Sequence, residues 1–101
     1  MQTDEKDIEA KFCRAVQNAG GWAVKFTSPG LAGVPDRLVI LADSSVCFAE
    51  MKKLGKKMRP LQKAVKHKLE SYGLDVWLID SDAAITAFIK EMQIQGKLIR
   101  M

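Results

Sequence analysis

The sequence predicts an α/β fold in which a mixed four-stranded sheet is flanked by helices. Apolar runs of strand length recur along the chain, and stretches with apolar residues three and four positions apart stand before, between and after them. The resulting order is helix, three strands, helix, strand, helix. A helix between the third and fourth strands permits a parallel crossover beside an antiparallel meander. With 101 residues, 48% of them hydrophobic, we expect one domain, residues 1–101.

The first element is expected to be a helix over residues 4–19. Apolar residues recur on one side of this stretch at helical spacing, and Gly20-Gly21 follows it as a stop signal. The predicted inner face consists of Ile8, Phe12, Ala15, Val16 and Ala19.

A short strand is predicted over residues 22–26, and a loop of mainly small residues over 27–33 leads to Pro35-Asp36. Trp22 and, later in the chain, Trp77 both lie in strand patterns. We therefore expect both indole rings in the core and not in a base-stacking surface.

Residues 37–42 and 46–49 are near-continuous apolar runs and are predicted as the strands of a hairpin. Asp43-Ser44-Ser45 between them provides turn chemistry.

A second helix is expected to begin at Pro60, after a basic loop over residues 54–58, and to end at Gly73. Its predicted apolar stripe consists of Leu61, Ala64, Val65, Leu69 and Tyr72.

A fourth strand is predicted over residues 74–79, and Ser81 is expected to cap a last helix. The tail, residues 96–101, is expected to add a short strand or to stay loose. The inner face of the last helix suits either the core or a dimer contact, and its residues are Ile85, Phe88, Ile89 and Met92.

Three charged residues stand at the ends of the hairpin strands: Asp36, Glu50 and Lys52. Such groups are costly in a buried strand unless they are paired or bind metal. Glu50 and Lys52 must point the same way, because side chains alternate between the faces of a strand. A loop with an odd number of residues brings Asp36 to that face, whereas a two-residue loop sends it to the opposite face unless a bulge intervenes.

Pro35-Asp36 and Glu50-Met51-Lys52 together resemble the two halves of the PD-(D/E)xK nuclease motif. The bare motif is a weak signal, but Glu9 on the first helix, Gly33 and Gln62 resemble the VRR-NUC (virus-type replication–repair nuclease) family more closely. This resemblance covers about residues 9–80. It implies a restriction-endonuclease-like αβββαβ core.

The charged cluster has the chemistry of a Mg²⁺ or Mn²⁺ site, because these hard cations prefer oxygen ligands. We assign Asp36 and Glu50 as direct ligands, and Lys52 as the group that holds the scissile phosphate or orients the attacking water. The alternative for these three is a surface salt bridge. The resemblance implies the Met51 carbonyl as a third ligand.

Glu9 and Gln62 lie at the edges of their helices' apolar stripes, so each can reach inward. Glu9 would then act as a second-metal or water-mediated ligand, and Gln62 would contact the nucleophilic water or the phosphate. An ordinary helix-face glutamate and an exposed glutamine are equally compatible with the sequence.

The stretch from Lys52 to Lys68 holds eight of the 16 basic residues and no acidic residue. A solvated helix face explains many such runs, but a basic stretch that begins at the carboxylate cluster is also suited to the DNA backbone. The predicted nucleic-acid contacts are Lys53, Lys56, Lys57, Arg59, Lys63 and Lys66.

These observations predict a metal-dependent, structure-specific DNA endonuclease. The resemblance implies branched substrates such as Holliday junctions, a homodimer, and a phage or mobile-element origin. The alternatives are a non-catalytic nucleic-acid-binding module and an interaction subunit of a larger replication or repair nuclease complex. No glycine pattern indicates a nucleotide cofactor, and no apolar run spans a membrane, so we expect a cytoplasmic protein, in the host cytoplasm if it is phage-encoded.

Overall fold

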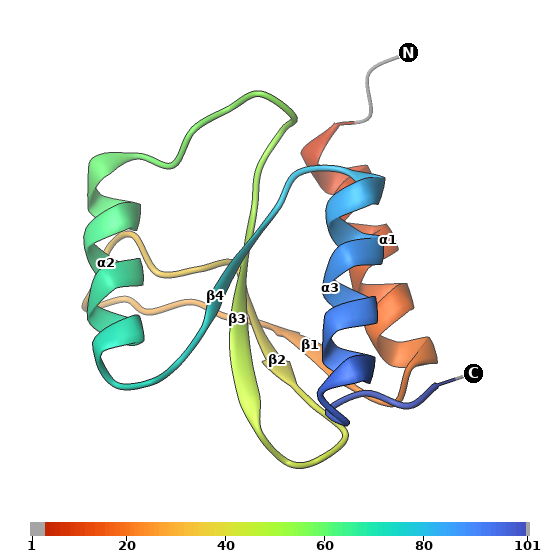
Figure 1. The fold of residues 1–101 in the computed structure, drawn as a ribbon. Coiled ribbons are helices and arrows are strands. Elements are labelled where there is room, and N and C mark those ends of the chain that lie inside the picture. The colour runs from red at the N-terminus through yellow and green to blue at the C-terminus, as the bar shows by residue number, and fades with distance from the viewer. Residues whose placement is uncertain (1–3, 101) are drawn as a thin grey trace.

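The computed structural model describes residues 4–100 and places three helices around one four-stranded sheet (Figure 1). The predicted order of elements is confirmed, with small shifts at their ends. In chain order they are α1 (Glu5–Asn18), β1 (Trp22–Lys25), β2 (Arg37–Ile40), β3 (Val46–Met51), α2 (Pro60–Ser71), β4 (Val76–Ile79) and α3 (Asp82–Ile94).

The sheet is mixed, with the strands in the order β1-β2-β3-β4. β1, β2 and β3 form an antiparallel meander, and β4 pairs parallel with β3. A parallel pair needs a crossover connection, which α2 supplies. This is the αβββαβ core that the sequence predicted, extended by α3.

Helices cover the two faces of the sheet unequally: α1 and α3 lie side by side against one face, and α2 stands on the other (Figure 1). The core lies under α1 and α3, where the Phe12 and Phe88 rings are 5.2 Å apart. Ile85, Phe88 and Met92 of α3 are buried against the rest of this chain. Of the two roles open to that helix face, the structure shows the core.

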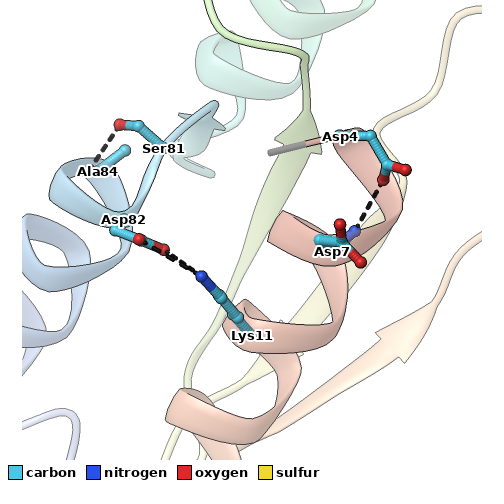
Figure 2. A network of polar contacts seen from close by, with 6 residues as sticks. All are labelled: Asp4, Asp7, Lys11, Ser81, Asp82 and Ala84. Atoms are coloured by element: carbon cyan, nitrogen blue, oxygen red, sulfur yellow. Dashed lines mark hydrogen bonds and ion pairs between the residues drawn. The ribbon is translucent and has the colours of Figure 1, made fainter. Parts of the chain in front are cut away.

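Polar contacts fix the first turns of α1 and α3 (Figure 2). The carboxylate of Asp4 accepts a hydrogen bond from the Asp7 amide, and the Ser81 hydroxyl accepts one from the Ala84 amide, at 3.0 and 3.1 Å. Each side chain satisfies an amide that has no partner within the helix. Lys11 and Asp82 form an exposed ion pair at 3.3 Å between the two helices, of the kind that contributes little to stability.

The hairpin of β2 and β3 has the odd-numbered loop on which the sequence argument depended. Ile40 pairs with Val46, so residues 41–45 form the connection. Within it the Leu41 amide donates to the Ser45 carbonyl at 2.9 Å, and Ser44 adopts a φ of 74°. A left-handed residue at this place is typical of three-residue hairpin turns. Directly opposed residues therefore have numbers that sum to an even value.

One prediction about buried side chains is wrong. Trp22 is 64% exposed, because it lies on the edge strand β1, on the α2 side of the sheet but at a part of it that α2 does not cover. Trp77, by contrast, packs edge-on against Phe88 beneath α3.

The apolar stripe of α2 is largely exposed: only Val65 of that helix is buried, and Tyr72 is 73% exposed. The backbone of α2 approaches β4 most closely among the strands, so little apolar surface is available to cover its stripe.

The tail after α3 runs past the end of the sheet that carries the β2–β3 loop and forms no strand within residues 96–100. The Ile99 amide donates to the Ala19 carbonyl, and the Ala42 amide donates to the Lys97 carbonyl, at 2.8 and 2.7 Å. Leu98 is buried between these two contacts. The end of α1 and the hairpin loop are thus tied together by the tail. Residue 101 lies outside the described part of the chain.

Candidate active site

Asp36 and Glu50 lie opposite each other at the open end of the central hairpin. Arg37 pairs with Ala49, and one step outward along the two strands the same register matches Asp36 with Glu50. The Phe26 amide donates to the Asp36 carbonyl at 2.9 Å, which continues the β1–β2 pairing to this residue. Side-chain alternation then places Asp36, Glu50 and Lys52 on the α2 side of the sheet.

Hydrogen bonds hold both carboxylates in position. Asp36 Oδ2 accepts a bond of 2.7 Å from the Met51 amide. Glu50 Oε2 accepts one of 2.7 Å from Gln62 Nε2 and lies 3.5 Å from Lys52 Nζ. Glu50 is 2% exposed and Lys52 is 9% exposed, so the ion pair is buried. This is not the exposed salt bridge that was the alternative for the three residues.

Burial makes ionisation of Glu50 costly. Loss of water around the carboxylate raises its pKa from 4.5 to about 7, with the negative charge of Asp36 acting in the same direction. The Lys52 ammonium opposes both effects but does not cancel them. A carboxylate pair in this condition attracts any further positive charge that can enter between its members.

The residues present fit a hard divalent cation. Asp36 and Glu50 supply two carboxylates, and the pKa of Glu50 is raised first by burial and then by the negative charge of Asp36, effects that a bound cation would oppose. The N–H and C=O groups of one strand residue point to the same side, so the Met51 carbonyl lies on the side of Asp36, like the Met51 amide. Within residues 4–100, no three His, Cys, Asp or Glu side chains are close enough to form a metal site of their own. The other ligands would therefore be carbonyl oxygens and waters.

Gln62 joins the site through the first turn of α2. Its Oε1 accepts a hydrogen bond of 2.9 Å from the Arg59 amide and so caps the helix, while its Nε2 donates to Glu50. The start of α2 is itself seated on the loop before Asp36, where a Cβ on Gly33 would be 2.9 Å from the Leu61 carbonyl oxygen. Gln62 is therefore a fixed contact of Glu50 and not an exposed glutamine. Its catalytic role stays a prediction.

Glu9 points to a different set of partners. Its Oε2 accepts a hydrogen bond of 2.8 Å from Arg37 Nε and lies 4.0 Å from Lys25 Nζ. Arg37 is paired with Ala49, so this contact lies on the α1 side of the sheet, opposite to Glu50. The structure does not bring Glu9 together with Asp36 and Glu50, and its role as a metal ligand stays a prediction.

Beside the cluster is an open hollow of about 640 Å³ between the first turn of α1 and the segment that joins β3 to α2. Lys63 lies outside this lining, on the exposed side of α2, and Lys66 is paired with Glu70 at 2.7 Å. The segment before α2 contributes Lys52, Lys53, Lys56, Lys57 and Arg59 to the lining, and the start of the chain contributes Asp4, Glu5 and Lys6. The sequence carried no signal for these last three, because the approach of α1 to this segment is a result of packing.

The fold and this arrangement together define the class of the protein: a PD-(D/E)xK nuclease domain. No family model matches the chain. It is similar to a solved structure described as a "VRR_NUC domain", with a TM-score of 0.80, 25% identity, and coverage of 85% of this chain and 94% of the other. It is 42% identical over 77 residues to "Putative nuclease p44" of Acyrthosiphon pisum secondary endosymbiont phage 1, which is 76% of this chain and 83% of the relative. The chain belongs to the VRR_NUC family.

Among residues 4–100, no helix is long and apolar enough to cross a membrane.

Proposed function

We propose that this protein is a metal-dependent DNA endonuclease, with residues 1–101 as a single nuclease domain. The observation that carries the proposal is the cluster of half-buried Asp36 with buried Glu50 and Lys52 at one end of the central hairpin, beside a hollow lined mainly by basic side chains. Membership of the VRR_NUC family and the likeness to a phage protein named as a nuclease support it.

Hydrolysis of a phosphodiester requires neutralised phosphoryl oxygens, an activated water and a stabilised leaving oxygen. Asp36, Glu50 and the Met51 carbonyl would hold Mg²⁺ or Mn²⁺, which supplies Lewis acidity and lowers the pKa of bound water. A cation there would also favour the ionised form of Glu50, whose pKa is raised by burial and, to a smaller extent, by the negative charge of Asp36.

The chain's own residues act around this centre. Lys52, buried next to Glu50, holds the scissile phosphate or orients the attacking water, and its positive charge helps deprotonation by stabilising the hydroxide that forms. Gln62 donates to Glu50 Oε2 and so fixes the orientation of that carboxylate. Contact of the Gln62 amide with the water or the phosphate would require this bond to be released. Glu9 would take part only if its contact with Arg37 were released.

The substrate that we propose is branched DNA, such as a Holliday junction, cut by a homodimer in the host cytoplasm. Lys53, Lys56, Lys57, Arg59, Lys63 and Lys66 would contact the DNA backbone, and such contacts position DNA without reading its sequence. Two symmetric cuts require two sites, which a twofold dimer provides.

The test compares a labelled four-way junction with a linear duplex of matched sequence in Mg²⁺, Mn²⁺ or EDTA. We expect cutting of the junction that depends on the metal, and we expect Lys52→Ala to lower its rate on the order of 100-fold or more. Lys90→Ala on α3 is the matched lysine control, and thermal unfolding shows whether each variant is folded. Light scattering of the complex gives the number of protein chains.

Binding of both DNAs without cleavage in any metal would contradict the proposal and identify a non-catalytic DNA-binding module. Cleavage by Lys52→Ala at the wild-type rate would leave the nuclease in place but remove Lys52 from its mechanism.

A further inference from the structure

An exposed leucine stands among the lysines directly after the candidate site. The Lys56 amide donates to the Lys53 carbonyl at 2.9 Å, and Gly55 has a φ of 85°, so residues 53–56 form a turn of type II character. Leu54 occupies the second position of this turn and is 69% exposed. It is separated from Lys52 by a single residue.

The turn projects away from the body of the protein. A Cβ on Gly55 would meet nothing within 4 Å, whereas the corresponding atom on Gly33 would collide with α2. Lys53 and Lys56, at the two ends of the turn, line the basic hollow, and Leu54 is absent from the described residues that line it. The leucine side chain is therefore held at the tip, clear of both the core and the hollow.

Single exposed leucines are common on protein surfaces and need no explanation of their own. The position of this one is different, because Lys53 and Lys56, on either side of it in the turn, line the hollow that the proposed function assigns to the DNA backbone. Apolar side chains next to cationic phosphate contacts are the groups that proteins insert between base steps.

We propose that Leu54 is a wedge that enters the base stack where the duplex is interrupted, while Lys53 and Lys56 hold the neighbouring phosphates. The inference rests on the proposed function and identifies a residue that determines its substrate. Unstacking costs a few kcal/mol at an intact step and least where bases are already unpaired or mismatched. Leu54 therefore favours branch points over continuous duplex.

The test uses a four-way junction with 2-aminopurine next to the branch point, and a linear duplex that carries the same base. We expect wild-type protein in EDTA to increase the fluorescence of the junction, because an unstacked 2-aminopurine is brighter. Leu54→Ala should lose this increase and lose on the order of tenfold in kcat/KM for the junction in Mg²⁺, with the duplex unaffected. Leu54→Phe should retain both. Leu31→Ala is the matched control, since Leu31 is also an exposed leucine on a turn.

An unchanged fluorescence increase with Leu54→Ala, or an equal loss of cleavage on junction and duplex, would overturn the wedge while leaving the nuclease intact. If wild-type protein binds the junction but cuts nothing, the proposed function fails and the fluorescence comparison still decides the role of Leu54. Absence of any binding to DNA would overturn both.

Discussion

Burial sets the cost of ionising Glu50, and that cost links the stability of the protein to its chemistry. The folded-state pKa of about 7 lies above the ordinary value of 4.5, so the folded protein binds this proton more tightly than the unfolded chain does. The contribution of Glu50 to the free energy of unfolding is therefore complete below about pH 4.5 and is lost as the pH rises to about 7. The loss amounts to an upper limit of about 3 kcal/mol.

We accordingly expect Glu50→Gln to gain stability relative to wild type as the pH is raised. Denaturant unfolding in EDTA at pH 4.5 and pH 8 measures the difference, which should grow by up to about 3 kcal/mol in favour of the variant. Mg²⁺ at pH 8 should restore stability to wild type and not to Glu50→Gln, because a cation bound by the carboxylates stabilises only the folded state. Glu91→Gln on α3 controls for the substitution itself. A difference that is the same at both pH values would contradict the assignment.

Single residues differed in how far the sequence could predict them. Asp36, Glu50 and Lys52 could be placed on one face because strand periodicity and the parity of the loop decide it, although their roles stay a prediction. The bond from Gln62 to Glu50 could not be predicted, since it depends on where α2 docks. The Glu9–Arg37 contact could not be predicted either, because it depends on how α1 packs against β2.

The contact between the loop before Asp36 and the start of α2 is the element-level feature that places Gln62. Gly33 adopts a φ of 87°, and its Cα hydrogen faces the Leu61 carbonyl closely enough to exclude a side chain. Gly73, at the other end of α2, has almost the same φ of 84° but open space around it. Alanine substitutions at the two positions therefore distinguish the cost of a left-handed backbone, which both share, from the cost of a steric clash, which only position 33 has.

We expect Gly33→Ala to destabilise the fold more than Gly73→Ala does. Both alanines incur about 1–2 kcal/mol from the left-handed backbone. Only the alanine at position 33 also displaces α2, and with it Gln62, so junction cleavage should fall for this variant alone. Denaturant unfolding and cleavage rates measure the two effects. Equal stabilities and equal rates for the pair would show that α2 does not depend on this contact.

The elements were predictable in order and type, because each carries its own periodicity and end signals. The burial of α2 was not, because an amphipathic pattern predicts an apolar stripe but not what covers it. The sheet stops at β4 on this side, and the loop before Asp36 occupies part of the space beside α2. Leu61 and Tyr72 are left exposed as a result.

At the scale of the whole molecule, the charge is unevenly distributed. The formal net charge is +4, but basic side chains gather around the hollow beside the hairpin end. The crossover rule predicted how the strands are arranged, whereas the hollow arises because the start of α1 meets a segment distant in sequence, which no local pattern encodes.

The uneven charge predicts which lysines set the salt dependence of DNA binding. Removing Lys53 and Lys56 as a Lys→Gln pair should reduce the slope of log K against log salt concentration by about 2, since each lost phosphate contact lowers it by about 0.9. Fluorescence anisotropy on a linear duplex between about 50 and about 300 mM salt measures the slope. Lys90→Gln with Arg100→Gln, which remove two charges near the end of α3, should leave it unchanged. An equal change of the slope for both double variants would indicate that the net charge of the protein attracts DNA and that no particular surface binds it.

The odd number of residues in the hairpin loop also limits which insertions and deletions would keep Asp36 opposite Glu50. Exposed loop tips are usually the places where insertions and deletions are tolerated. Here, removing or adding one residue between Ile40 and Val46 would exchange the faces of one strand relative to the other and separate Asp36 from Glu50, unless a bulge absorbed the change. Changes by two residues carry no such penalty. A surface loop far from the hollow therefore decides, by whether its number of residues is odd or even, whether Asp36 and Glu50 share one face of the sheet.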